Sequence, residues 1–208
     1  MEGFDRKAHW ENIYETRPLD TVSWYQPKPE TSLRYFKALA TRKDARILDV
    51  GGGDSFLVDH LLDEGYSDIT ILDISEKGIE RAKARLGDRA EKITWINSDI
   101  TNFEPEGQYD LWHDRAAFHF LNSEEEIQKY LEIASKAIRP GGNLVLGTFS
   151  TEGPTKCSGI EIRQYSPGSM IELFGKNFFN VGYQTIDHKT PKGGLQNFVF
   201  CSFQRLRD

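Results

Sequence analysis

Short apolar runs alternate with longer amphipathic segments from residue 45 to residue 149. The short runs are rich in β-branched residues, and the longer segments repeat apolar residues every three or four positions, so they predict strands and helices respectively. We expect strands at 45–50, 68–74, 93–96, 109–112 and 143–149, and helices at 55–62, 76–86 and 124–139. Such alternation is typical of an α/β protein in which a parallel sheet carries helices on both faces.

Two of the helices have clear end signals. Ser75 is a good N-cap for the helix that follows it, because its hydroxyl accepts a hydrogen bond from a free backbone N–H of the first turn. Ser123 and Glu126 have the spacing of a capping box. Pro140-Gly-Gly142 predicts the end of that helix, since proline and glycine interrupt helical backbone.

The pattern changes after Phe149. A long loop at 150–159 precedes a helix at about 167–174, and two strand-like runs at 179–186 and 197–203 flank a Gly-rich turn, which predicts a hairpin of antiparallel edge strands. Residues 1–44 carry several aromatic side chains and three prolines without a strand pattern, and they predict a helical cap across the open edge of the sheet. We expect one domain over 1–208, with the cap at 1–44, a cofactor-binding core at 45–149 and a substrate-side loop and hairpin at 150–208.

Composition limits the function classes. The 208 residues are 38% hydrophobic and 28% charged, as in an ordinary globular protein, and the formal net charge is −6. A duplex-DNA binder needs a basic stripe, so nucleic acid is not expected as a partner. No run of about 18 apolar residues and no signal-peptide pattern is present, so we expect a cytoplasmic protein without a membrane segment.

The two cysteines, Cys157 and Cys201, are too few for a disulfide framework and do not share a metal-ligand spacing. We expect free thiols, with Cys157 in a loop where it could react. No metal site is expected.

Three glycines, Gly51, Gly52 and Gly53, follow the strand at 45–50. Without Cβ atoms this turn lets the backbone approach a ligand closely, and doubly wound sheets bind ligands at this edge. Asp73, at the end of the next strand, suits the two hydroxyls of a ribose, because an ionised carboxylate accepts two hydrogen bonds. Asp49 is well placed for a ligand with an ammonium or sulfonium group.

Two further positions refine the ligand. Asp99 follows the third strand, where its carboxylate suits an adenine amine, and Ile100 is available to pack on the ring. The dinucleotide fingerprint requires a small third residue, but that position holds Phe56, which is too large for close helix–strand packing. A pyrophosphate cradle is therefore not supported.

Together these segments resemble class I S-adenosylmethionine-dependent methyltransferases. The resemblance rests on LDVGGGDS, ILDIS, NSDI, YDLWHD, RPGG and LVLGTF, although Ser55 stands where the family has its last loop glycine. It implies a single Rossmann-like, doubly wound seven-stranded sheet in the order 3-2-1-4-5-7-6, with strand seven antiparallel. It also implies S-adenosyl-L-methionine as the cofactor and a set of site residues. The residues expected at the cofactor are Asp49, Gly51, Gly52, Gly53, Asp73, Ile74, Asp99 and Ile100, with His113, Trp10 and Trp24 beside them.

A second resemblance concerns the aromatic N-terminal segment, which is similar to that of thiopurine-type and small protein-lysine methyltransferases. Asp114 matches the first aspartate of the D-K-G-T-x-D-A motif of one lysine methyltransferase group, whereas Ala116 and Ala117 replace its G-T and His119 replaces its second aspartate.

The loop after the fourth strand is expected to carry the chemistry, because it opens beside the methyl group. Methyl transfer mainly needs orientation, and a general base only for a nucleophile that arrives protonated. We expect His119 as that base, Asp114 as the partner of a cationic group, and Tyr25 in the aromatic wall that excludes water. Arg115 is expected to pair either an acidic substrate or Asp114.

The leading hypothesis is a methyltransferase that modifies nitrogen, oxygen or sulfur of a small molecule. The alternatives are a protein-lysine methyltransferase, a nicotinamide-dependent oxidoreductase and a cofactor-binding subunit without turnover. The sequence does not name the acceptor or the oligomeric state.

Overall fold

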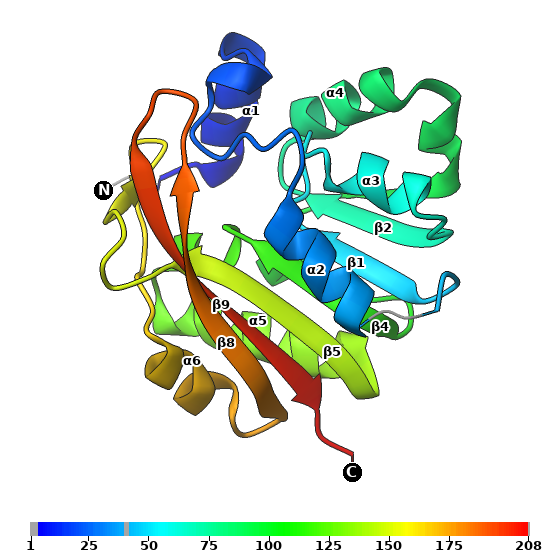
Figure 1. Cartoon of the computed structure of the whole chain (residues 1–208), viewed down its shortest axis with the longest axis vertical. Helices are drawn as coiled ribbons and strands as arrows, with labels where there is room; N and C mark the ends of the chain where they lie inside the picture. The colour runs from blue at the N-terminus through cyan, green and yellow to red at the C-terminus, as the bar shows by residue number, and fades with distance from the viewer. Residues whose placement is uncertain (1–3, 40–41, 208) are drawn as a thin grey trace.

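The structure is a computed structural model and describes residues 4–39 and 42–207. In this part of the chain, seven strands form one sheet in the order β3-β2-β1-β4-β5-β9-β8 (Figure 1). The strands are β1 (Arg46–Val50), β2 (Asp68–Asp73), β3 (Ile93–Asn97), β4 (Tyr109–Arg115), β5 (Ile138–Phe149), β8 (Phe178–Lys189) and β9 (Leu195–Arg205). Strands β1 to β5 pair in parallel, and β9 is antiparallel to both β5 and β8. The predicted strand order and the antiparallel seventh strand are confirmed.

Several strands are longer than predicted. β4 continues through residue 115, and β5 begins at Ile138, so Pro140–Gly142 lies inside a strand and not at the end of a helix. The predicted hairpin of antiparallel edge strands is confirmed, because β8 and β9 pair antiparallel. Since β9 is also antiparallel to β5, β8 at the edge runs parallel to β5. A small ribbon of β6 (Lys156–Cys157) and β7 (Ile160–Glu161) lies in the segment expected to be a loop.

Six α-helices and four 3-10 turns occur in the described residues. The helices are α1 (Arg6–Thr16), α2 (Glu30–Leu39), α3 (Leu57–Asp63), α4 (Glu76–Leu86), α5 (Glu124–Ala137) and α6 (Pro167–Phe174). The turns are η1 (Leu19–Thr21), η2 (Gly87–Lys92), η3 (Ile100–Asn102) and η4 (Phe118–Phe120). Ser75 caps α4, and Ser123 forms the predicted capping box with Glu126 at the start of α5.

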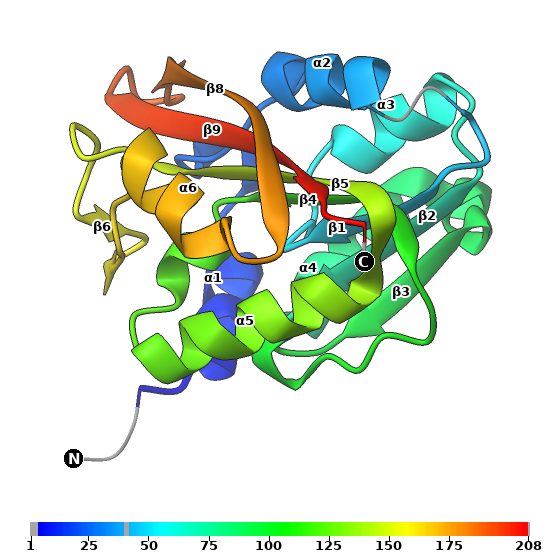
Figure 2. The same ribbon diagram turned by 90° about the horizontal axis from the view of Figure 1, so that it is seen from below.

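The sheet separates two hydrophobic cores, because successive strand side chains point to opposite faces. On one face α2 and α3 pack against residues such as Ile47 and Leu111. On the other face α5 and α6 pack against Leu48 and Trp112, the sequence neighbours of those two residues. Figure 2 shows α2 and α3 above the sheet and α5 below it.

The N-terminal segment is helical, as predicted, but it does not form one cap. Helix α2 packs on the face of the sheet beside α3, through Leu33 and Phe36. Helix α1 lies apart from α2 and next to α4 (Figure 1), where the Glu11 carboxylate accepts hydrogen bonds from the backbone N–H groups of Glu76 and Lys77 at 2.7 and 3.1 Å. Glu11 therefore ties α1 to the first turn of α4.

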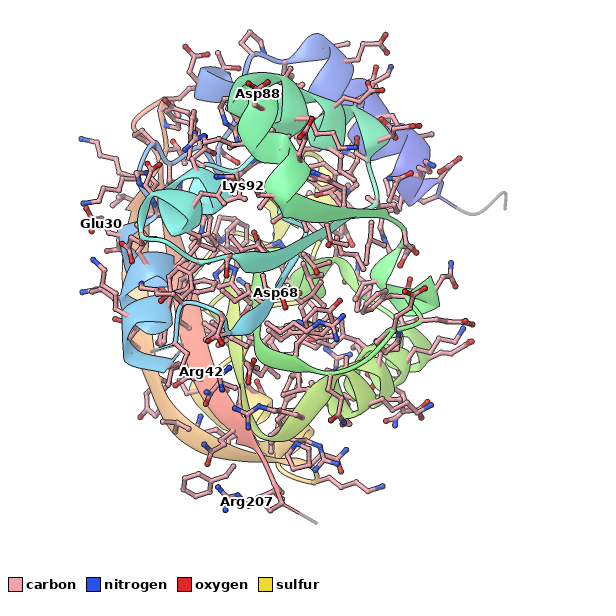
Figure 3. The ribbon with its side chains drawn as sticks, turned by 90° about the vertical axis from the view of Figure 1, so that its right-hand side faces the viewer. Glu30, Arg42, Asp68, Asp88, Lys92 and Arg207 are labelled. Atoms are coloured by element: carbon pink, nitrogen blue, oxygen red, sulfur yellow. The ribbon has the colours of Figure 1, made fainter. Side chains whose placement is uncertain are left out.

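Charged residues of both signs are exposed on the surface of the molecule. Figure 3 labels six exposed charged residues on the outside of the ribbon, namely Glu30, Arg42, Asp68, Asp88, Lys92 and Arg207.

Among the described residues, no helix combines the length and the apolar character that crossing a membrane requires.

Candidate functional site

A cavity opens at the carboxyl ends of β1, β2 and β4, and most of the predicted site residues line it. Those that line it are Trp10, Trp24, Tyr25, Asp49, Gly51, Gly52, Asp73, Ile74, Asp99, Ile100 and His113. The parallel strands end at the same edge, which is why residues far apart in sequence meet there. Gly53 lies just behind this wall, where the Tyr14 ring covers it.

The glycine loop needs glycine for two separate reasons. Gly51 and Gly53 have φ angles of +67° and +43°, a region that side-chain-bearing residues rarely adopt. A Cβ on Gly51 would lie 2.7 Å from the Cβ of Ala117, and one on Gly52 would lie 2.8 Å from Oδ2 of Asp49. At each of the three positions, a neighbouring side chain already occupies the space that a Cβ would need.

Asp73 is buried at the end of β2, with its side chain directed at the glycine loop. Its Oδ1 accepts a hydrogen bond from the backbone N–H of Ser75 at 2.8 Å. Burial raises the pKa of Asp73 to about 7, and the nearby carboxylates of Asp54 and Asp49 act in the same direction. A ligand that offers hydroxyl donors to this carboxylate would favour its ionised form.

Asp49 is held by a buried hydrogen-bond chain. Its Oδ1 lies 2.7 Å from Nδ1 of His113, whose Nε2 lies 2.9 Å from the hydroxyl oxygen of Ser32 in α2. An ionised carboxylate only accepts, so in the neutral imidazole Nδ1 donates to Asp49 and the Ser32 hydroxyl donates to Nε2. Both ring nitrogens of His113 are therefore occupied, and the histidine orients Asp49.

Asp99 is already engaged within the protein. Its Oδ1 accepts from the backbone N–H and the hydroxyl of Thr101, both at 2.8 Å, and so caps the turn η3. Its Oδ2 lies 3.1 Å from the guanidinium of Arg6 in α1. The prediction that Asp99 accepts from an adenine amine did not include these partners. An adenine amine would have to share Oδ2 with Arg6.

Aromatic side chains from α1 and from the segment before α2 form the other wall. Trp10 packs edge-to-face against Trp24 and Phe120, with ring centroids 5.6 and 5.2 Å apart. Tyr25 packs against Phe56, the residue whose size argued against a dinucleotide site, at 6.1 Å. These aromatic side chains line the same cavity as the carboxylates.

Asp114 does not line the cavity, contrary to the expectation that it holds a cationic group there. It is completely buried, and its carboxylate accepts hydrogen bonds from the backbone N–H groups of Ala117 and Phe118 and from the hydroxyl of Tyr130, at 2.9 to 3.1 Å. Burial raises its pKa to about 6 despite these donors. Strand alternation explains the placement, because Asp114 points to the α5 face, as does Trp112 two residues before it.

His119 is also placed outside the cavity wall, so the expectation of a general base that faces the ligand is wrong. The ring is completely buried, and its Nδ1 accepts from the backbone N–H of Phe149 at 3.3 Å. Burial and, to a smaller extent, the nearby Arg115 lower the pKa of His119 to about 3. The ring is neutral at physiological pH and packs between Phe120 and Phe149.

The cysteines are free and buried, as predicted. Cys157 lines the cavity, but burial raises its pKa to about 11, so the thiol stays protonated near pH 7 and is a poor nucleophile. In residues 4–39 and 42–207, no group of three or more histidine, cysteine or acidic side chains could hold a metal ion.

Arg6 and Ser32 also belong to the site, and neither was expected there from the sequence. Arg6 lines the cavity and pairs with Asp99, and a helical projection would have found it, because Arg6, Trp10 and Tyr14 are spaced four apart on one helix face. Ser32 reaches His113 from a helix that the sequence left as an undifferentiated cap, and no local signal marks it.

Comparison with known proteins agrees with this geometry. Residues 47–142 match the family model described as "Methyltransferase domain". The mouse protein named "eEF1A lysine and N-terminal methyltransferase" is 25% identical over 225 aligned residues, which cover 96% of this chain and 31% of the mouse protein. The chain thus spans less than a third of the length of that curated relative.

Solved structures resemble the whole chain. A structure from work on the conversion of a disulfide bond into a thioacetal group during echinomycin biosynthesis has a TM-score of 0.79 at 17% identity, covering 97% of this chain and 92% of that one. The N-methyltransferase NodS from Bradyrhizobium japonicum, solved with S-adenosyl-L-homocysteine, has a TM-score of 0.73 at 16% identity, covering 98% and 100%. Residues 47–142 are therefore similar to the methyltransferase-domain family, and the chain has the fold of these solved structures.

Proposed function

We propose that the chain transfers a methyl group from S-adenosyl-L-methionine to a nucleophilic atom of a small molecule. The observation that carries this proposal is that the glycine loop, the carboxylates of Asp49 and Asp73, and an aromatic wall all border one cavity. The loop and the carboxylates suit the cofactor, because they combine close backbone approach with acceptors for hydroxyl and ammonium donors.

Different residues of the cavity would contact different parts of the cofactor. Asp73 would accept from the ribose hydroxyls, Asp49 would lie near the positively charged methionine end, and Ile100 would pack on the adenine. The NodS neighbour, which is solved with S-adenosyl-L-homocysteine, supports the same cofactor for this fold. When bound, the cofactor supplies an electrophilic methyl group on a sulfonium centre.

The protein's contribution to transfer is orientation and the exclusion of water. His113 is the histidine that lines the cavity in the described part of the chain, and both of its nitrogens are already hydrogen bonded. We therefore favour an acceptor atom that carries a free lone pair near neutral pH, held by the aromatic wall that includes Tyr25. Asp114 and His119 are assigned structural roles in this scheme.

A protein acceptor is the second candidate, and the mouse relative favours it because its name specifies lysine and N-terminal methylation. The residue that carried this resemblance, Asp114, is satisfied by three donors and faces away from the cavity. The aromatic side chains that line the cavity also favour a small acceptor over an extended polypeptide.

The first experiment is a calorimetric titration of the purified chain with S-adenosylhomocysteine, with NADH in parallel. We expect binding of the former alone in the micromolar range, and loss of that binding in Asp73→Asn. The matched control is Asp68→Asn, an exposed aspartate on the same strand. Binding of NADH alone, or of neither compound, would contradict the proposal.

The second experiment identifies the acceptor class. The protein is incubated with a cell extract and radiolabelled S-adenosylmethionine, and the products are separated by size. Label in the low-molecular-weight fraction supports a small-molecule acceptor, whereas label in protein supports the second candidate. Cofactor binding without any label transfer would indicate a subunit without turnover.

A further inference from the structure

Arg115 ends β4 at the rim of the cavity and is held there by an unusual turn. The next residue, Ala116, has a φ of +68°, which is uncommon for a residue with a Cβ, and its N–H donates to the carbonyl of Gly147 at 2.8 Å. Arg115 itself lines the cavity, and its Nη1 donates to the carbonyl oxygen of Trp24 at 3.3 Å. The turn thus fixes a positive charge on the wall of the site.

This guanidinium has no acidic partner. Within the described residues, no carboxylate oxygen lies within 4.0 Å of Arg115, and its Nη2 is buried without a hydrogen bond. Other arginines of the chain do have such partners, for example Arg139 with Asp110 and Arg85 with Asp59. Arg115 therefore does not pair with Asp114, which was one of the two alternatives that the sequence left open.

The carboxylate of Asp49 favours the charged form of Arg115, but it lies beyond 4.0 Å of the guanidinium and is hydrogen bonded to His113. Burial raises the pKa of Cys157 to about 11 and lowers that of His119 to about 3, so both are neutral near pH 7. Burial also lowers the pKa of His188, which faces the same guanidinium. On its other side Arg115 lies over the ring of Phe198, with Cζ 5.0 Å from the centroid. A buried charge without a hydrogen-bonded partner of opposite charge is unfavourable unless a ligand supplies one.

We propose that Arg115 binds a carboxylate of the methyl acceptor, and that the acceptor is an aromatic monocarboxylic acid. This inference rests on the proposed function. A guanidinium fork matches a planar carboxylate, and the apolar rings of Trp24 and Tyr25 on the same cavity suit an aromatic body. A single negative charge is favoured over two, because Asp49 and Asp73 border the same cavity and repel additional negative charge.

The cofactor also carries a carboxylate, at its amino-acid end, so the test must distinguish the two sources. We assign Arg115 to the acceptor because it lies beside Cys157, which belongs to the segment 150–208 that is expected on the substrate side. The test compares wild type, Arg115→Met and a control, Arg163→Met, which removes an arginine that pairs with Glu124 outside the cavity. S-adenosylhomocysteine is titrated into each protein first.

We expect all three proteins to bind S-adenosylhomocysteine with dissociation constants that agree within about threefold. The saturated proteins are then titrated with benzoate, phenylacetate and 3-phenylpropionate and with the corresponding amides. At least one acid should bind wild type and Arg163→Met at least about tenfold more tightly than its amide, and Arg115→Met should lose this preference.

Three results would overturn the inference. The first is an acid preference that persists in Arg115→Met, and the second is the absence of any acid preference in wild type. The third is a tenfold loss of S-adenosylhomocysteine affinity in Arg115→Met, because that result would assign Arg115 to the cofactor. Failure of wild type to bind S-adenosylhomocysteine would instead contradict the proposed function. If Arg115→Met does not fold, Arg115→Gln, which is polar but uncharged, replaces it and should lose the acid preference in the same way.

Discussion

Replacing Asp73 with asparagine tests the electrostatic cost of placing a carboxylate in this site. Burial raises the pKa of Asp73 from 3.8 to about 7. Between about pH 5 and pH 7 the unfolded chain has therefore lost a proton that the native protein still binds, and the native state loses stability as the pH rises. The slope is about 1.4 kcal/mol per pH unit, so two units correspond to roughly 3 kcal/mol.

The Asp73→Asn variant lacks this titration but keeps an oxygen that can accept from the N–H of Ser75. We expect the difference in unfolding free energy between wild type and Asp73→Asn to change by roughly 3 kcal/mol between about pH 5 and pH 7, in favour of the variant at the higher pH. Urea denaturation followed by tryptophan fluorescence at several pH values measures it. Asp68→Asn, at the exposed start of the same strand (Figure 3), is the control and should show no such change.

Parallel pH profiles for wild type and Asp73→Asn would refute the reasoning, because they would mean that Asp73 has the same proton affinity in the native and unfolded states. The carboxylate would then be solvated in the native protein, and its assigned role as a desolvated ribose acceptor would lose its physical basis.

Three further substitutions test other parts of the structure. Gly53→Ala should weaken S-adenosylhomocysteine binding at least about tenfold, because the added Cβ overlaps the neighbouring tyrosine hydroxyl and φ is +43°. Tyr130→Phe should lower the unfolding free energy by about 2–3 kcal/mol without changing cofactor affinity, because it removes a buried donor from Asp114. Ser123→Ala should cost about 1 kcal/mol in urea denaturation, because it removes the cap of α5.

Matched variants control for general effects of substitution. Gly65→Ala adds the same strain, at a φ of +88°, where no atom lies within 4 Å, so it should reduce stability by about 1 kcal/mol and leave cofactor affinity unchanged. Tyr183→Phe removes a hydroxyl from an exposed tyrosine and should be neutral. Equal loss of affinity in Gly53→Ala and Gly65→Ala, or equal stability of Tyr130→Phe and Tyr183→Phe, would contradict these assignments.

The sequence by itself determined the sheet, its strand order and the ligand edge. Each of these depends on local signals or on the family resemblance: β-branched runs, serine caps such as Ser75 and Ser123, and glycines where the chain must turn beside a ligand. These signals act over a few residues, so they are visible without knowledge of the fold. For the same reason Asp49 and Asp73, at the ends of adjacent strands, could be placed at one cavity.

Only the tertiary structure decided which side chains of the fourth strand meet that cavity. The sequence pattern ended this strand at Trp112, whereas β4 continues to Arg115, so side-chain alternation also governs the next three residues. It directs His113 and Arg115 toward the α2 face and the cavity, and Asp114 toward Tyr130 on the opposite face. Spacing alone could not supply this result, because it depends on where a strand ends and on contacts with helices distant in sequence.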